Sequence, residues 1–113
     1  MARQVTDEWR SVEEAFVELD ELGASRSVLA AMRSLVTAIR ADSRFHDLAP
    51  SVSHEHLVFR RGGKRAVIVL WNAGDADYRV AFLEPGFTFR NPRRATRETV
   101  LDVLLEYLVL APP

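Results

Sequence analysis

The chain has 113 residues, of which 48% are hydrophobic and 27% charged, and its formal net charge at pH 7 is -1. This length predicts a single α+β domain over residues 1–113, and the composition excludes disordered, collagen-like and low-complexity classes. The lack of cysteine excludes disulfides, thiol nucleophiles and cysteine-ligated zinc. No apolar run approaches the roughly 20 residues that span a bilayer, and the first residues lead into an acidic segment in place of a signal-peptide core. We therefore expect a cytoplasmic protein without membrane contact.

The first predicted element is an amphipathic helix over residues 6–23. Thr6 is a suitable N-cap, and Gly23 is the usual kind of residue to follow the last helical turn. Apolar residues recur at spacings of three and four, as a core-facing stripe requires: Trp9, Val12, Phe16, Leu19 and Leu22. The opposite face is acidic and carries Glu13, Glu14, Glu18, Asp20 and Glu21. A solvated face is the simplest interpretation of this charge.

A second helix follows, capped by Ser25 or Ser27, and completes a helical hairpin. Arg26, Arg33 and Arg40 are seven residues apart, which aligns three guanidinium groups along this helix. The stripe has three interpretations: it pairs with the acidic face of the first helix, it meets an acidic protein partner, or it contacts phosphates. We take the three arginines as candidate partner-binding residues.

Three short runs of β-forming residues predict antiparallel strands, over residues 56–61, 65–72 and 78–83. Two clusters of turn residues, at 62–64 and 72–77, join these strands into a meander. In the second cluster, Asp75 and Asp77 suit local backbone hydrogen bonds. The middle strand is apolar at nearly every position, so both of its faces need cover. Helices would cover one face, and a loop, a further strand or a second molecule would cover the other.

The segments that flank the meander are less regular. Residues 42–53 suggest a loop, with a short edge strand at 44–48 as an option. Residues 87–89 alternate just long enough for a fourth strand, which Asn91 and Pro92 would end. Thr96 suits the N-cap of a last, strongly apolar helix. The predicted fold is thus α+β: an N-terminal helical hairpin, a three- to four-stranded antiparallel meander, and a C-terminal helix packed on the sheet.

Charge is unevenly distributed along the chain. Residues 1–23 carry seven acidic groups against two arginines, whereas residues 24–65 carry eight basic groups against three acidic ones. The two regions either neutralise each other in the fold or form a dipolar binding surface.

A basic turn joins the first two strands of the meander and is a candidate anion site. Its four basic residues are Arg60, Arg61, Lys64 and Arg65. The spacing of its residues differs from that of a phosphate-binding loop. Such a loop precedes a helix, whereas this turn has a predicted strand on each side. A charged hairpin tip is therefore the simpler interpretation. If nucleic acid is bound, the phosphates would meet this turn and the later arginines, Arg90, Arg93, Arg94 and Arg97.

Two aromatic residues lie near the second turn of the meander. Trp71 and Tyr78 would anchor a protein interface if they lay on an open face of the sheet. Burial in the core is the alternative. We take both as candidate partner-binding residues.

His54 and His56 form the one metal-like cluster in the sequence. Two residues apart on a strand, their imidazoles would point the same way. A third ligand is missing from the motif, although His46 or Asp47 could provide it. Since zinc sites show three or four ligands, we expect no metal, no cofactor and no catalytic residue here.

The layout resembles that of the small immunity proteins of bacterial toxin systems. The likeness covers about the last sixty residues, in the strands GKRAVIVLWNAGDADYRVAFLEPG and the closing helix RETVLDVLLEYL. It implies a non-enzymatic protein that binds and blocks a cognate toxin, with charged patches that speed capture.

Three functional hypotheses follow. The first is a non-enzymatic protein-binding module, an immunity or antitoxin-type inhibitor or an accessory chaperone. The second is a nucleic-acid accessory protein that uses the basic turn, and the third is a metal hydrolase that uses His54 and His56. A homodimer through an uncovered sheet face or edge is compatible with each of them.

Overall fold

The computed structural model describes residues 5–60 and 63–111, and its element order confirms the predicted α+β class. Two helices come first, α1 (Val5–Glu21) and α2 (Arg26–Ala41), followed by a single 3-10 turn, η1 (Ser43–Phe45). Five strands follow, namely β1 (Ala49–Ser53), β2 (His56–Arg60), β3 (Val67–Asn72), β4 (Asp77–Glu84) and β5 (Thr88–Ala95). The last element is α3 (Val100–Leu110).

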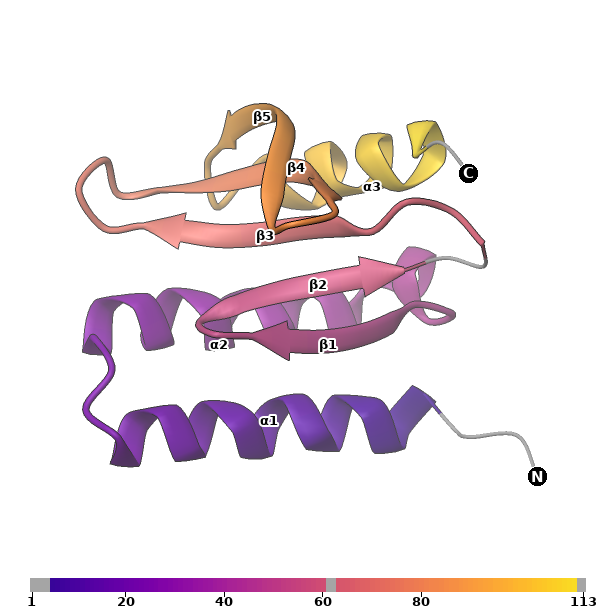
Figure 1. The fold of residues 1–113 in the computed structure, drawn as a ribbon. Helices are drawn as coiled ribbons and strands as arrows, with labels where there is room; N and C mark the ends of the chain where they lie inside the picture. The colour runs from indigo at the N-terminus through magenta and orange to yellow at the C-terminus, as the bar shows by residue number, and fades with distance from the viewer. Residues whose placement is uncertain (1–4, 61–62, 112–113) are drawn as a thin grey trace.

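The five strands form one antiparallel meander in the order β1-β2-β3-β4-β5. Figure 1 shows α2 and α3 behind the sheet and α1 alongside β1. β1 is thus next to a helix at one margin of the sheet, while β5 is the strand at the other margin. The ladder between β4 and β5 contains an irregularity between Val80 and Phe82, which is the kind of bulge that bends a strand pair.

One hydrophobic core joins the three helices to the sheet. It contains Trp9 and Phe16 from α1, Met32 from α2, Val69 from β3 and Leu104 from α3, among other buried residues. Alternate residues of the strands face this core because side chains on a strand point to opposite sides in turn. The middle strand is buried on both faces, as its sequence predicts, since Val67 and Val69 join this core while Ile68 joins a second, smaller cluster.

The helical hairpin turns at Gly23, as predicted. Gly23 has φ of +87°, and the Ala24 N–H donates to the carbonyl of Leu19 over 3.0 Å. This is the left-handed closure for which glycine is favoured. Ser25 occupies the N-cap position of α2.

The sheet has five strands, so the expectation of three or four strands was wrong. β1 lies where a loop was expected, and η1 with the turn after it occupies residues 43–47, where a short edge strand at 44–48 was the option. Pro50 is tolerated in β1 because a proline without an N–H can occupy a strand that is paired on one side only. β5 continues through Pro92 to Ala95 for the same reason.

Two predicted helix caps were also wrong. α1 already includes Thr6, because the helix begins at Val5. α3 begins later than expected, with Thr99 in the N-cap position, and the N–H of Thr96 donates to the Thr99 hydroxyl over 2.9 Å. In the part of the chain that the structure describes, no helix has the length and apolar character to cross a membrane.

Candidate partner-binding surface

The face of the sheet that is remote from the main core is closed by the chain itself. Val58, Ile68 and Ala81 lie side by side on β2, β3 and β4 and are buried in the second cluster. The turn between β4 and β5 folds back toward the β1–β2 turn, so that Phe87 contacts His54 across the sheet. Figure 1 shows the start of β5 in front of β3. The cover expected for this face is thus provided by a turn of the same chain.

Four rings from the two turns form what we call the aromatic patch: His54, His56, Phe87 and Phe89. The Phe87 ring stacks on His56 with centroids 6.0 Å apart and planes at 19°, and it lies 5.8 Å from His54. Phe89 is 5.5 Å from Phe87 and 6.4 Å from His56. Phe87 is still 42% exposed and Phe89 36% exposed. These rings therefore present apolar surface to solvent from a mutually packed group.

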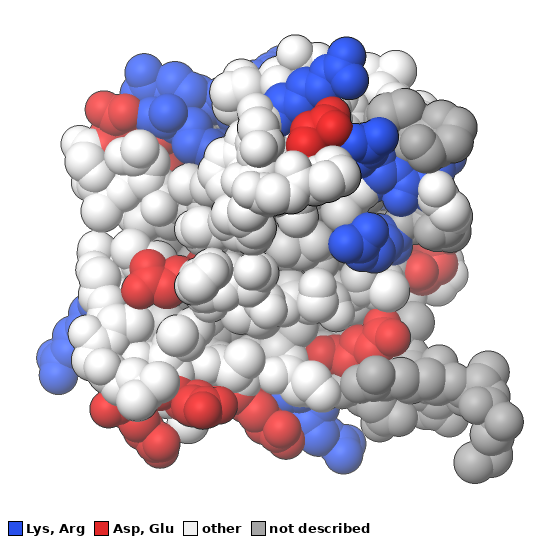
Figure 2. Space-filling model, in the orientation of Figure 1, with Lys and Arg blue, Asp and Glu red and all other residues white. Residues whose placement is uncertain are grey.

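The charges around this patch are arranged asymmetrically. Figure 2 shows that the middle of this face is mostly uncharged, with basic side chains gathered toward the top and acidic ones along the bottom. The bottom of this view corresponds to α1 in Figure 1. An apolar centre with a charged surround is the usual composition of a protein interface.

The backbone beneath the patch adopts a conformation that bulky residues rarely take. His54 has φ of +57° and Phe87 has φ of +59°. The left-handed region costs an L-residue with a Cβ roughly 1–2 kcal/mol. Glycine would relieve that cost at either position, so each ring is held where local stability alone would favour a smaller residue.

His56 lies at the inner side of the patch and is half-buried. Burial, followed by the charge of His54, lowers the pKa of the His56 imidazole below its ordinary value, and the nearby Glu55 only partly opposes this shift. Its Nδ1 atom is buried and has no hydrogen-bond partner among the described residues. The His56 ring is therefore neutral at pH 7, which keeps this part of the patch apolar.

Trp71 and Tyr78 lie on the opposite side of the sheet from the aromatic patch. Tyr78 is 1% exposed, and its hydroxyl donates to the carbonyl of Ala31 over 2.7 Å. Trp71 is partly buried, packs edge-on against Tyr78 at 4.7 Å, and carries the Arg97 guanidinium over its ring at 5.4 Å. Tyr78 thus belongs to the core, which was the alternative interpretation, and the exposed aromatic rings on the other side of the sheet are Phe87 and Phe89.

The arginine stripe of α2 is exposed along its length. Arg40 pairs with Glu13 of α1, which agrees with the interpretation that the two helices neutralise each other. Arg26 and Arg33 have no ion pair among the residues that the structure describes. The stripe is therefore neutralised at one end only.

The basic turn between β2 and β3 is only partly described, because Arg61 lies outside the described residues. Arg65 forms an ion pair with Glu84, and the Lys64 ammonium lies 3.4 Å from the carbonyl of Val109 in the last turn of α3. A cation at a helix C-terminus interacts favourably with the helix dipole. Arg60 is exposed on β2. Two of the four candidate anion-binding residues thus have partners within the chain.

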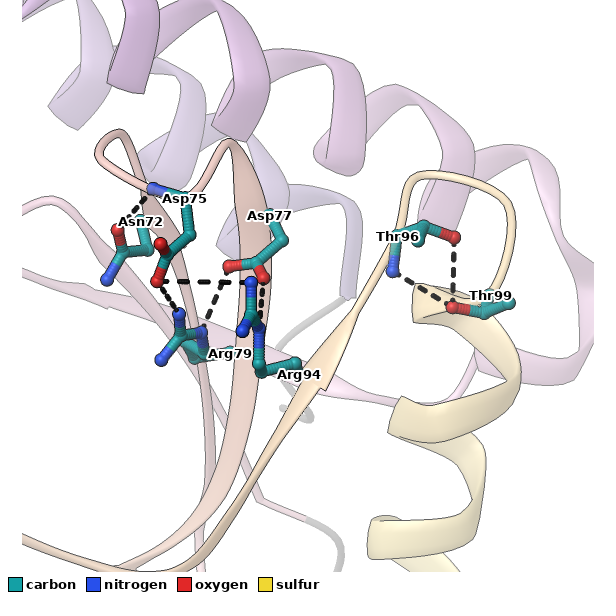
Figure 3. Close-up of polar contacts among 7 residues, drawn as sticks. All are labelled: Asn72, Asp75, Asp77, Arg79, Arg94, Thr96 and Thr99. Carbon is teal, nitrogen blue, oxygen red and sulfur yellow. Dashed lines mark hydrogen bonds and ion pairs between the residues drawn. The ribbon is translucent and has the colours of Figure 1, made fainter.

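The arginines of β5 also have partners within the chain. Asp77 is 8% exposed and accepts hydrogen bonds from Arg79 over 3.0 Å and from Arg94 over 2.6 Å (Figure 3). Arg93 pairs with Glu106 over 2.6 Å. The Asp77 hydrogen bonds join β4 to β5, and the separate Arg93–Glu106 pair joins β5 to α3. Fewer free cations therefore remain for a phosphate backbone.

The two neighbouring histidines remain without a third ligand in the described structure. The His54 and His56 ring centroids are 6.5 Å apart. No group of three or more His, Cys, Asp or Glu residues that could hold a metal occurs within residues 5–60 and 63–111.

Phe87 and Phe89 are the site residues that the sequence did not single out. They were visible only as a short alternating run after the Pro85–Gly86 turn. The signal that could have identified them is an aromatic residue directly after Pro-Gly, at a position where turns favour glycine.

Comparisons of the chain with protein-family models, curated proteins and solved structures found no significant match. The functional argument therefore rests on the geometry described above.

Proposed function

We propose that this protein is a non-enzymatic protein-binding module and that the aromatic patch is its docking surface. The observation that carries the proposal is the exposed Phe87 ring, held on a left-handed backbone and stacked on His56. Strained backbone at bulky residues concentrates at functional sites, because the surrounding structure must compensate for its cost.

The chemistry of the patch favours a protein partner. Aromatic anchors that are rigid before binding lose little conformational entropy, and aromatic residues dominate binding energy in interfaces. Arg65, Arg93 and Arg94 are engaged in ion pairs within the chain, which weakens the case for nucleic acid as the partner. The resemblance to immunity proteins suggests that the partner is a toxin domain; an accessory chaperone would use the same surface for a client protein.

The proposal is tested by removing the ring without straining the fold. Glycine in place of Phe87 deletes the anchor and suits the left-handed backbone, so relief of the backbone strain offsets part of the lost ring packing and Phe87→Gly should still fold. Partner affinity should fall about thirtyfold or more, because truncating a central anchor typically costs at least ~2 kcal/mol. The measurement is capture of the tagged protein's partner from its host lysate with nuclease present, followed by titration with the purified partner.

Ala76→Gly is the matched control. Ala76 has φ of +53° in the turn between β3 and β4, away from the patch, so the substitution makes the same backbone change without removing a ring. The control should retain full affinity. Equal binding by wild type and Phe87→Gly would remove the patch from the interface, and captured material that disappears on nuclease treatment would favour the nucleic-acid hypothesis.

A further inference from the structure

The two helices of the N-terminal hairpin carry opposite charge. α1 contains seven acidic residues and one arginine, whereas α2 contains three arginines and no acidic residue. Within the hairpin only Arg40 and Glu13 are joined by a described ion pair. Glu14, Glu18 and Glu21 on α1, and Arg26 and Arg33 on α2, have no ion pair in the described part of the chain. Each helix thus presents unneutralised charge to solvent.

A groove runs between these helices on their outer side. It has a volume of about 370 Å³ and is lined by Glu13, Phe16 and Val17 from α1 and by Arg33, Val36 and Thr37 from α2. Val17 is 51% exposed, although it lies beside the buried Phe16 and Val36. The surface therefore has an apolar floor between an acidic wall and a basic wall.

The positions of the charges follow a common spacing. Arg33 and Arg40 are seven residues apart, which is about 10.5 Å along a helix, and Glu14 and Glu21 are separated by the same distance. α1 and α2 are antiparallel, and Arg40 lies opposite Glu13. Counting from that pair along both helices places Arg33 level with residues 20 and 21 of α1. The acidic row on α1, Glu14 and Glu21, is therefore in register with the basic row on α2, Arg33 and Arg40.

From this arrangement we propose that the outer face of the α1–α2 hairpin binds a second copy of the chain. A two-fold axis parallel to the groove would set α1 of one protomer against α2 of the other, with the two helices antiparallel. Each acidic row would then face a basic row, with Arg40 near Glu14 and Arg33 near Glu21, twice in the dimer. An axis across the helices would instead set α1 against α1, which like charges oppose. This interface is separate from the aromatic patch and does not depend on the function proposed for it.

Charge reversal gives a specific test. In a symmetric dimer, the variant Arg33→Glu places a glutamate of each protomer against the acidic α1 of the other protomer. The double variant Glu18→Arg with Glu21→Arg places two arginines of each α1 against Arg33 of the other protomer. Each variant alone should dimerise at least about tenfold more weakly than wild type, because the unfavourable contact occurs twice. An equimolar mixture of the two variants should form a 1:1 heterodimer, since every acidic row then meets a basic row again. Arg60→Glu, an exposed change of equal charge on β2, is the matched control.

The measurement is sedimentation velocity of the full chain over a concentration series at about 0.02 M and about 0.5 M NaCl, because salt screens exposed charges. The proposal expects a wild-type dimer at low salt that weakens at high salt, an unaffected control, and recovery of the dimer only in the mixture. A monomeric wild type at every concentration would overturn it. A dimer that persists in Arg33→Glu, or variants that stay apart when mixed, would equally overturn it. Circular dichroism of each variant shows that loss of the dimer is not loss of the fold.

Discussion

At the scale of single residues, the unusual backbone positions carry the most information. The described non-glycine residues with positive φ are His54, Ala76, Phe87 and Asn91. His54, Ala76 and Phe87 lie in strand connections, whereas Asn91 lies within β5 at the irregularity of the β4–β5 ladder. Only His54 and Phe87 are large rings, and these two contact each other. Asparagine and histidine are several-fold enriched in this conformation, so Phe87 is the aromatic residue for which it is most unusual. The aromatic patch differs from an ordinary turn because Phe87 combines a left-handed backbone, an exposed ring and a contact with a second ring, that of His54.

His56 makes the stability of the fold depend on pH in a predictable direction. Its folded-state pKa lies below its ordinary value of 6.5, because burial and the charge of His54 disfavour the imidazolium. As pH falls below that ordinary value, the unfolded chain binds a proton that the folded chain resists, so the free energy of unfolding decreases until the folded-state pKa is passed. We expect urea denaturation to show lower stability at about pH 5.5 than at about pH 7.5.

His56→Phe should reduce this dependence, since the ring can keep its stack on Phe87 without titrating. His46→Gln is the control, because His46 is exposed beside η1, away from the patch. An unchanged pH dependence in His56→Phe, together with a reduced one in His46→Gln, would contradict the assignment.

At the scale of elements, the turn between β3 and β4 shows what local sequence can and cannot predict. Asn72 accepts the local hydrogen bond, from the Asp75 N–H over 3.0 Å, whereas the carboxylates of Asp75 and Asp77, which were expected to accept from the local backbone, accept from arginine side chains. Asp77 does something that local sequence could not indicate, because its second arginine comes from β5, 17 residues later. The strand pairing of β4 and β5 had to be known before Arg94 could be placed beside it.

The Asp77 network should stabilise the β3–β4 and β4–β5 connections above acidic pH. Burial tends to raise the pKa of the Asp77 carboxyl, but the hydrogen bonds from Arg94 and Arg79 outweigh burial and lower it below its ordinary value of 3.8. The stabilisation is therefore present above that value and is lost as pH falls through the folded-state pKa. Asp77→Asn should lower the melting temperature at pH 7, and the difference from wild type should shrink under acid.

Thermal melts by circular dichroism at neutral and acidic pH measure this effect. Asp75→Asn is the comparison, because its carboxylate also pairs with Arg79 but is about half exposed, and such pairs contribute little. A loss in Asp75→Asn as large as that in Asp77→Asn would contradict a special role for the buried carboxylate.

At the scale of the whole molecule, periodicity predicted the helices and the three central strands, and long-range packing decided the remainder. The apolar stripes of α1 and α2 and the alternation in β4 follow from burial of one face, so they were visible in sequence. β1 was missed because Ser51 and Pro50 resemble a loop until pairing with β2 is known. The aromatic patch was missed for the same kind of reason: its rings come from two turns that meet only when the β4–β5 turn folds back across the sheet.

Because one core joins all three helices to the sheet, the described structure should unfold as a single cooperative unit. The two tryptophans report on different parts, Trp9 on α1 and Trp71 on β3, so the variants Trp9→Phe and Trp71→Phe each retain one local fluorescence probe. Leu104→Ala, which opens a cavity in α3, should cost about 2–5 kcal/mol. In a shared core that loss must shift both fluorescence transitions equally and keep each coincident with circular dichroism. If Leu104→Ala left the Trp9 fluorescence transition unchanged, the helical hairpin would unfold separately from the remainder. The free energy of unfolding would then have to be assigned to two units.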